Sequence, residues 1–178
     1  AAIFILLAAV SACRIAVGND YWVYRFQFNL IMQGRHVSYE PGFNLVVWVI
    51  QSLLGYDNYL PVFAVFSIAT CFFFVKAMYD QAEWFGASVF LLMTGGYYYS
   101  SLNSVRYYFV LAIAMYAMKY VLRKQYGVFL AWIVFAAFFH KSILVVIPVY
   151  LFAHWLAQHK LNKLLYILGG TLLASLLL

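Results

Sequence analysis

The stretch Leu60 to Met78 reads LPVFAVFSIATCFFFVKAM and contains one charged residue, Lys76. A helix that crosses a bilayer needs about 20 such residues. Long apolar runs recur along the 178-residue chain, which is 67% hydrophobic, 21% aromatic and only 9% charged. A transmembrane barrel would instead show alternating segments of about ten residues. The sequence therefore predicts an all-α, polytopic transmembrane helical bundle.

Several of the apolar runs are shorter than a full crossing requires. We expect helices near Ala1–Ala12, Gly42–Leu54, Leu60–Met78, Phe85–Tyr99, Val105–Leu122, Val128–Phe139, Ser142–Ala157 and Leu164–Leu178. The short ones are either tilted helices with extended ends or re-entrant partial crossings. Pro148 lies inside one run and predicts a kink there. Because the chain begins and ends inside apolar runs, we expect residues 1–178 to be one integral-membrane domain and a fragment of a longer protein.

A polar, aromatic segment spans residues 17–41, between the first two apolar runs. Within it Tyr24–Leu30 alternates in the way that is typical of a strand. A lone strand at a membrane would leave its backbone groups unpaired. We therefore expect an amphipathic helix that lies in the membrane interface.

The net charge of +6 does not indicate nucleic-acid binding, because no basic stripe with interleaved stacking aromatics is present. Basic residues instead fall between apolar runs, as in multi-pass membrane proteins. The chain has no phosphate-binding loop, no dinucleotide motif and no carboxylate pair for a metal-bound nucleotide sugar. Its histidines and cysteines lack metal-ligand spacing. We expect no metal and no cofactor, and the lipid bilayer as a partner.

Ionisable side chains beside apolar runs mark the candidate site, because charges in lipid are costly and by default functional. Arg106 offers a rigid fork of donors suited to phosphate. Asn103, three residues earlier, is expected on the same helix face. His140, next to Lys141, can act as a general base near neutral pH. The alternatives are an arginine that snorkels to the interface and a polar loop without function.

The polar segment adds further candidates at both of its ends. Tyrosines and carboxylates there could bind sugar hydroxyls, with Arg14, Asp20, Tyr24 and Glu40 as the residues concerned. The alternative for Asp20 and Glu40 is that each caps the N-terminus of the helix that follows it.

Topology separates these candidates if every apolar run crosses the membrane. Nine of the eleven Lys and Arg residues then share one face, which should be cytoplasmic. Arg106, Lys141 and His140 fall on the external face, and Asp20 falls on the other. If Asp20 belongs to the same site, the polar segment dips inward or a short run is re-entrant, with Phe85–Tyr99 and Val128–Phe139 as the candidates.

Four strings in order resemble the EpsG family of Wzy-like bacterial exopolysaccharide polymerases, over roughly residues 14–150. They are Arg14-x-x-Val-Gly-Asn-Asp20-Tyr-x-x-Tyr24, Glu40-Pro-Gly-Phe43, Leu-Asn103-Ser-Val-Arg106-Tyr and Phe-Phe-His140-Lys-Ser, the last followed by Ile147-Pro148. The chain departs from the family at three positions. Asn19 stands where the family often has Thr, Tyr107 where it often has Gln, and Lys141 where it often has a small or hydroxyl residue. Family members are longer, so a C-terminal portion is expected to be missing.

The resemblance implies a multi-pass glycosyltransferase of the bacterial plasma (inner) membrane that uses a polyprenyl-diphosphate-linked saccharide, in company with other polysaccharide-assembly proteins. Arg106, with Lys141, would hold the diphosphate, and His140 would activate the acceptor hydroxyl. The residues implied in substrate binding are Arg14, Asp20, Tyr24, Glu40 and Asn103. The alternatives are a transporter or flippase of a lipid-linked saccharide, which would use the same side chains without chemistry, and a structural membrane subunit.

Overall fold

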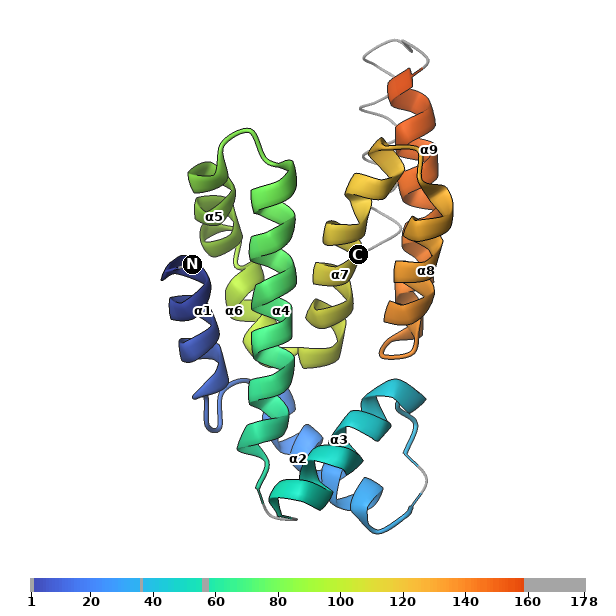
Figure 1. The fold of residues 1–178 in the computed structure, drawn as a ribbon. Coiled ribbons are helices and arrows are strands. Elements are labelled where there is room, and N and C mark those ends of the chain that lie inside the picture. The colour runs from blue at the N-terminus through green and yellow to red at the C-terminus, as the bar shows by residue number, and fades with distance from the viewer. Residues whose placement is uncertain (1, 36, 56–57, 159–178) are drawn as a thin grey trace.

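The computed structural model describes residues 2–35, 37–55 and 58–158, and this part of the chain consists of helices joined by loops, with no strand (Figure 1). The elements are α1 (Ala2–Ala12), α2 (Asp20–Met32), α3 (Pro41–Leu54), α4 (Leu60–Gln81), α5 (Phe85–Thr94), α6 (Tyr97–Asn103), α7 (Val105–Leu122), α8 (Tyr126–Ala137), the 3-10 helix η1 (Lys141–Val145) and α9 (Val146–Gln158). The predicted all-α fold is confirmed. The helix expected over Leu164–Leu178 lies outside the described residues.

Three helical stretches of the described chain are long and apolar enough to cross a membrane: α4, α7 and the continuous stretch of η1 with α9, Lys141–Gln158. The most extensive helix contact joins α4 to α7, with α1 packed on α4 and α8 packed on α7. Ala112, Ala114 and Ala117 of α7 are fully buried. Small residues at these positions let neighbouring helices approach closely, which is how membrane helices associate.

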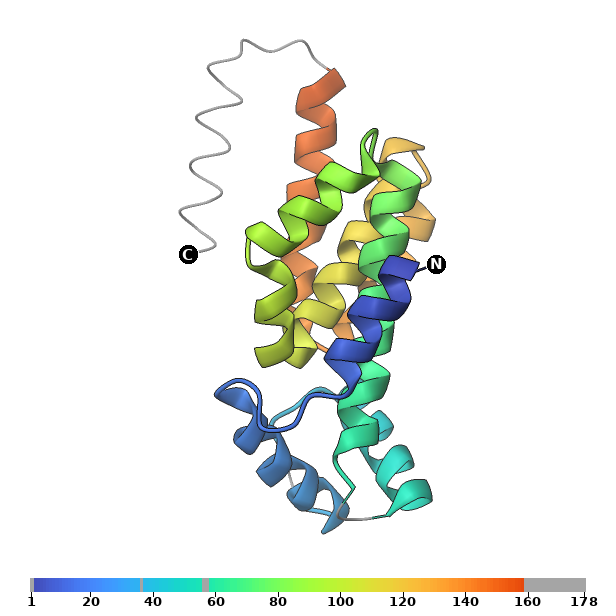
Figure 2. The same ribbon diagram turned by 90° about the vertical axis from the view of Figure 1, so that its left-hand side faces the viewer.

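Helices α2 and α3 lie together at one end of the bundle, which we call the α2–α3 end (Figures 1 and 2). Tyr21, Tyr24 and Phe28 of α2 are buried, while Trp22 and Phe26 are more than half exposed. The predicted helix within residues 17–41 is confirmed, and the strand suggested by the alternation does not form. Exposed aromatics beside a buried aromatic face suit a membrane interface. The interfacial location itself stays a prediction.

Helix α3 does not pass through the bundle. It lies beside α2, so the chain enters α4 from the same end at which it left α1 (Figure 2). Phe43, Val47 and Gln51, four residues apart, form its buried face, and its other face is exposed. The condition that every apolar run crosses, on which the charge count depended, therefore fails at Gly42–Leu54, one of the three runs that the sequence marked as too short for a full crossing.

This path brings residues 14–40 to the end of the bundle that also carries Arg106 and His140 (Figure 1). The path of α3 also changes how many Lys and Arg residues lie at each end of the bundle, which was the basis for predicting that Arg106 faces the outside. Among the described residues, the α2–α3 end carries Arg14, Arg25, Arg35, Arg106 and Lys141, and the opposite end carries Lys76, Lys119, Arg123 and Lys124. The two ends are nearly balanced, so the side of the membrane on which the site lies stays a prediction.

Two expectations about helix breaks are wrong. The run Phe85–Tyr99 divides at Gly95–Gly96, where Gly96 adopts a φ of 77° that glycine tolerates. Ser104 has a non-helical backbone, so Asn103 ends α6 and Arg106 belongs to α7 rather than to the same helix. The run expected as one helix over Ser142–Ala157 begins as the 3-10 helix η1, and Pro148 lies in the first turn of α9; the kink expected at Pro148 stays a prediction.

Candidate functional site

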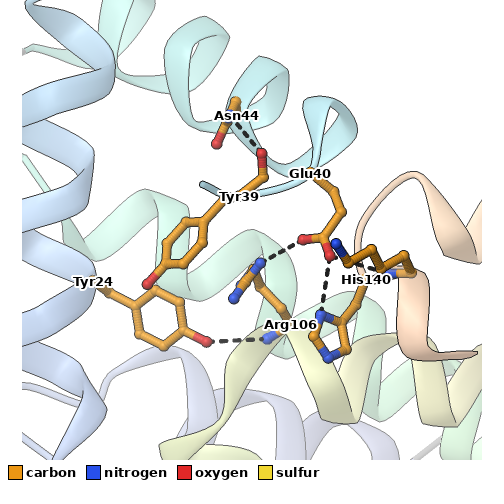
Figure 3. A network of polar contacts seen from close by, with 7 residues as sticks. Tyr24, Tyr39, Glu40, Asn44, Arg106 and His140 are labelled. Atoms are coloured by element: carbon orange, nitrogen blue, oxygen red, sulfur yellow. Dashed lines mark hydrogen bonds and ion pairs between the residues drawn. The ribbon is translucent and has the colours of Figure 1, made fainter. Parts of the chain in front are cut away.

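The candidate site surrounds the junction of α6 and α7, where the backbone leaves the helical conformation at Ser104, with φ −95° and ψ 77°. Arg106 follows in the first turn of α7. Its guanidinium Nη1 lies 2.5 Å from Oε2 of Glu40, which precedes α3 (Figure 3). The guanidinium also stacks on the ring of Tyr39, with 3.6 Å between its carbon and the ring centroid. Arg106 therefore points into the protein and does not snorkel to the interface.

Helix stability does not explain this position of Arg106. The N-terminus of a helix carries a partial positive charge, which disfavours a cation and favours an anion. The Arg106 side chain is only 15% exposed, and its Nε is buried without a hydrogen-bond partner among the described residues. Such an unused donor calls for an explanation. A cation, a helix N-terminus and a free N–H together form an anion-binding arrangement that Glu40 occupies in part.

Glu40 is the shared acceptor of the site. Besides Arg106, its carboxylate accepts the backbone N–H of Lys141 at 3.1 Å and lies 3.4 Å from Nδ1 of His140. It occupies the N-cap position of α3 but makes no capping hydrogen bond with its side chain. Burial by itself would raise the pKa of Glu40. The N–H of Lys141, its own N–H and the charge of Arg106 outweigh that effect and lower the pKa, so Glu40 is anionic.

His140 lies between α8 and η1, with its side chain 26% exposed. Its Nδ1 is within ion-pair distance of Glu40, but the angle is poor and Nδ1 has no hydrogen-bond partner among the described residues. Burial lowers the pKa of the imidazole below 6.5; Glu40 opposes this shift and Arg106 adds to it. The neutral imidazole, the form that can accept a proton, therefore predominates at neutral pH.

Asp20 binds the other side of the same junction. Its Oδ2 accepts hydrogen bonds from Ser104 Oγ at 3.0 Å and Asn103 Nδ2 at 3.3 Å, and its backbone N–H donates to Asn103 Oδ1 at 3.1 Å. The Asp20 side chain thus links α2 to the α6–α7 junction instead of capping α2. Gly18 makes the contact possible, because a Cβ there would lie 2.5 Å from Asn103 Oδ1.

Tyr24 and Arg14 support the junction from inside. The buried hydroxyl of Tyr24 accepts the backbone N–H of Arg106 at 3.5 Å (Figure 3). Arg14 Nη1 donates to the carbonyl of Ser101 at 3.2 Å, and its guanidinium lies over the ring of Phe63. Burial lowers the pKa of Arg14 to about 10, which leaves it charged at neutral pH. Arg14 Nε and Nη2 have no hydrogen-bond partner within the described chain.

The start of α3 is fixed against the end of α8. The N–H of Gly42 donates to the carbonyl of Phe138 at 2.9 Å. A Cβ at Gly42 would lie 2.8 Å from that oxygen, so no larger residue fits without movement. This close approach sets Glu40 beside His140 and Lys141.

The structure thus gathers the candidates into two adjoining sets. Arg106, His140 and the backbone of Lys141 meet at Glu40, with Tyr24 behind Arg106, while Asp20 and Asn103 bond to each other. Arg14 supports the junction from a neighbouring position. Sequence reasoning missed Tyr39 and Ser104. Their only signal was position: one precedes Glu40, and the other is a hydroxyl residue between Asn103 and Arg106.

The family model described as EpsG family matches residues 1–178, the whole chain. No curated protein and no solved structure matches. In the described part of the chain, no group of three or more His, Cys, Asp and Glu residues is placed to hold a metal ion.

Proposed function

The chain belongs to the EpsG family of membrane proteins related to exopolysaccharide biosynthesis, and we propose that it is a glycosyltransferase that joins saccharide units carried on a polyprenyl diphosphate. We further propose that it works as a multi-pass protein of the bacterial plasma membrane, together with other polysaccharide-assembly proteins. The observation that carries the proposal is the meeting of Arg106, Glu40 and His140, from three separate segments, at one end of a helical bundle.

The diphosphate of the donor binds Arg106 in this proposal. Its negative charge takes the place that Glu40 holds at Nη1 and uses the free Nε as well. A planar guanidinium can bind two phosphate oxygens at once. The N-terminus of α7 and the exposed ammonium of Lys141 favour the same charge. Arg106 then stabilises the charge that grows on the diphosphate as it leaves.

His140 takes the proton of the acceptor hydroxyl. The acceptor oxygen attacks the anomeric carbon of the donor, the bond from that carbon to the diphosphate oxygen breaks, and the diphosphate leaves with the electron pair. The hydroxyl proton passes to Nε2 of the neutral imidazole. Glu40, close to Nδ1, orients the ring and stabilises the imidazolium that forms. Glu40 is therefore a positioning residue in this proposal, in place of the sugar ligand that the sequence suggested.

Sugar hydroxyls bind beside this centre. Asp20 accepts both of its hydrogen bonds through Oδ2, which leaves Oδ1 for a hydroxyl. Tyr39 lies next to the start of α3, and its ring stacks against the guanidinium of Arg106. The saccharide bound there would reach from the α6–α7 junction toward His140.

The test is the fate of the glycan in cells that carry Arg106→Ala. We expect long polymer to disappear and single repeat units on the lipid carrier to gather outside the plasma membrane. Arg123→Ala, an exposed arginine at the opposite end of the bundle, is the matched control and should leave polymer length unchanged. Repeat units that gather inside would favour the flippase alternative. Polymer of normal length at normal protein level would overturn both and favour a structural subunit.

A further inference from the structure

An open groove adjoins the site on the side of α8. It has a volume of about 470 Å³ and is lined by Glu40, Pro41, Val134, Ala137, Phe138, Lys141 and Leu144. Two of these residues, Glu40 and Lys141, belong to the polar network just described. The others are apolar, and Val134 and Phe138 are half exposed. The groove therefore has one charged end, at the site, and an apolar remainder.

The apolar part continues along α8. A smaller hollow on the same helix, of about 310 Å³, is lined by Val128, Ala131, Trp132 and Phe135. Ala131, Val134 and Phe138 are three and four residues apart, so they share one helix face. Ten residues separate Val128 from Phe138, which corresponds to about 15 Å along the helix. This face leads from the membrane-embedded part of the bundle to Lys141.

Other hollows of the described chain lack this combination. A larger hollow, lined by residues of α1, α4 and α5, contains Phe4, Phe72 and other apolar residues, and its one charged residue is Lys76 at the opposite end of the bundle. A second, lined by Phe74, Met78 and Tyr150 among others, has no charged residue. The groove beside Glu40 thus joins an apolar surface to cationic and carboxylate groups of the site.

We propose that this groove holds the isoprene units nearest the diphosphate of the lipid carrier. The inference rests on the proposed function. Lys141 is an exposed cationic residue that lines the groove and bonds to Glu40 through its backbone N–H, which suits an anionic head with an apolar tail. Glu40, the acidic residue of the groove, also accepts the backbone N–H of Lys141 and lies beside His140, and both contacts remain when the diphosphate takes its place at Arg106. Because the groove is open, the rest of the carrier remains in the bilayer.

The groove positions the carrier rather than driving its binding. Lipid tails are as apolar as the groove, so its walls gain little hydrophobic free energy over the bilayer. What they gain is alignment of the anomeric carbon with His140. An experiment that locates the tail is therefore sharper than an affinity measurement.

Photo-crosslinking at Phe138 provides that experiment. Benzoylphenylalanine replaces Phe138 in one variant and Phe90 of α5, a residue that is at least as exposed, in the control. The probes are a polyprenyl diphosphate and the uncharged polyprenol of the same length. We expect the diphosphate to label the Phe138 variant about tenfold more than the control, because a bound head raises the local concentration of its tail. The polyprenol should label both variants equally. Val134 provides a second groove position if the Phe138 variant misfolds.

Binding of inorganic pyrophosphate separates the two proposals. If pyrophosphate binding depends on Arg106 but the polyprenyl diphosphate labels both variants equally, the proposal that the groove holds the isoprene units is wrong. The proposal that Arg106 binds the diphosphate is then retained. If pyrophosphate binding is absent or unchanged by Arg106→Ala, the proposed function fails and the inference fails with it. Preferential labelling of Phe138 that Arg106→Ala abolishes supports both.

Discussion

The two ends of the bundle each hold a buried ion pair, and they differ in how completely its groups are used. At the end away from the site, Asp80 of α4 accepts hydrogen bonds from Lys76 at 2.6 Å and Lys119 at 2.8 Å. The ammonium of Lys119 also lies 3.6 Å from the ring centroid of Tyr116. None of the buried side-chain atoms without a partner in the described chain belongs to this cluster, whereas Arg14, Arg106 and His140 all contribute such atoms.

This difference separates a structural ion pair from a candidate binding site. The Asp80 cluster joins α4 to α7, and none of its buried side-chain atoms lacks a partner within the described chain. The Glu40 cluster keeps donors and an imidazole nitrogen unpaired, although burying such groups costs roughly 1–3 kcal/mol each. A fold that keeps this cost at one end of the bundle, while the carboxylate–cation cluster at the other end has no buried atom without a partner in the described chain, is expected to recover the cost when substrate binds.

The largest effect is expected from Arg106→Ala. Loss of a preorganised charge at the leaving group should reduce the polymerisation rate by about 10²–10³-fold. The measurement is the rate of glycan extension in purified membranes with a polyprenyl-diphosphate saccharide. Arg106→Lys should recover little, because an ammonium lacks the planar fork. An unchanged rate in folded protein would contradict the assignment.

Asp80→Ala should lower stability and leave activity unchanged, the reverse of what is expected for Arg106→Ala. It leaves Lys119 buried without its carboxylate and should lower the free energy of unfolding by about 2–3 kcal/mol, less than for a fully buried pair because Lys76 is half exposed. Thermal unfolding in detergent would show this. The activity per folded molecule should stay near the wild-type value. A loss of activity per folded molecule would contradict the view that the Asp80 cluster is structural and the Glu40 cluster is the binding site.

Gly42→Ala tests the contact that fixes Glu40. The added Cβ would lie 2.8 Å from the carbonyl oxygen of Phe138, so α3 must shift, at a cost of about 1–3 kcal/mol. Activity should fall with stability, because Glu40 moves away from His140. Gly86→Ala is the control, since a Cβ there meets nothing within 4 Å and α5 should tolerate it. Equal behaviour of the two variants in thermal unfolding and activity would exclude the proposed constraint.

The titration of His140 should respond in opposite directions to its two charged neighbours. Its pKa is lowered below 6.5, so activity should rise with pH along a limb centred below 6.5, as the imidazole loses its proton. Arg106 lowers this pKa, and Arg106→Gln should raise it. Glu40 raises it, and Glu40→Gln should lower it. Nuclear magnetic resonance of labelled histidine measures both variants, and shifts of the same sign would refute the arrangement.

The smallest effect is expected from Lys141→Ala. The contact of this residue with Glu40 uses its backbone N–H, which the substitution retains. Only an exposed ammonium is lost, worth about 0.2–1 kcal/mol. Pyrophosphate binding should weaken a few-fold at low salt and hardly at all at high salt. A loss as large as that of Arg106→Ala would place Lys141 at the centre of the site.

The sequence predicted the helices well where apolar runs were long, and less well where they were short. The run Gly42–Leu54 is compatible with either a partial crossing or a surface helix, and its length alone does not decide between them. The break at Ser104 was hidden because Asn103 and Ser104 use their side chains on Asp20, 83 and 84 residues away. Arg106 and His140 stood out because isolated polar groups beside apolar runs are rare.

The sequence by itself determined that the chain is a helical membrane protein and which polar residues to examine. Both depend on local composition, which is a property of the chain before it folds. Only the tertiary structure decided which of those residues meet. Glu40 and Arg106 are 66 residues apart, and they pair because α3 stays at one end of the bundle while α7 begins there. The physical reason is that the amino-acid type alone determines the charge of a side chain, whereas the direction in which each helix runs determines which other side chain it meets.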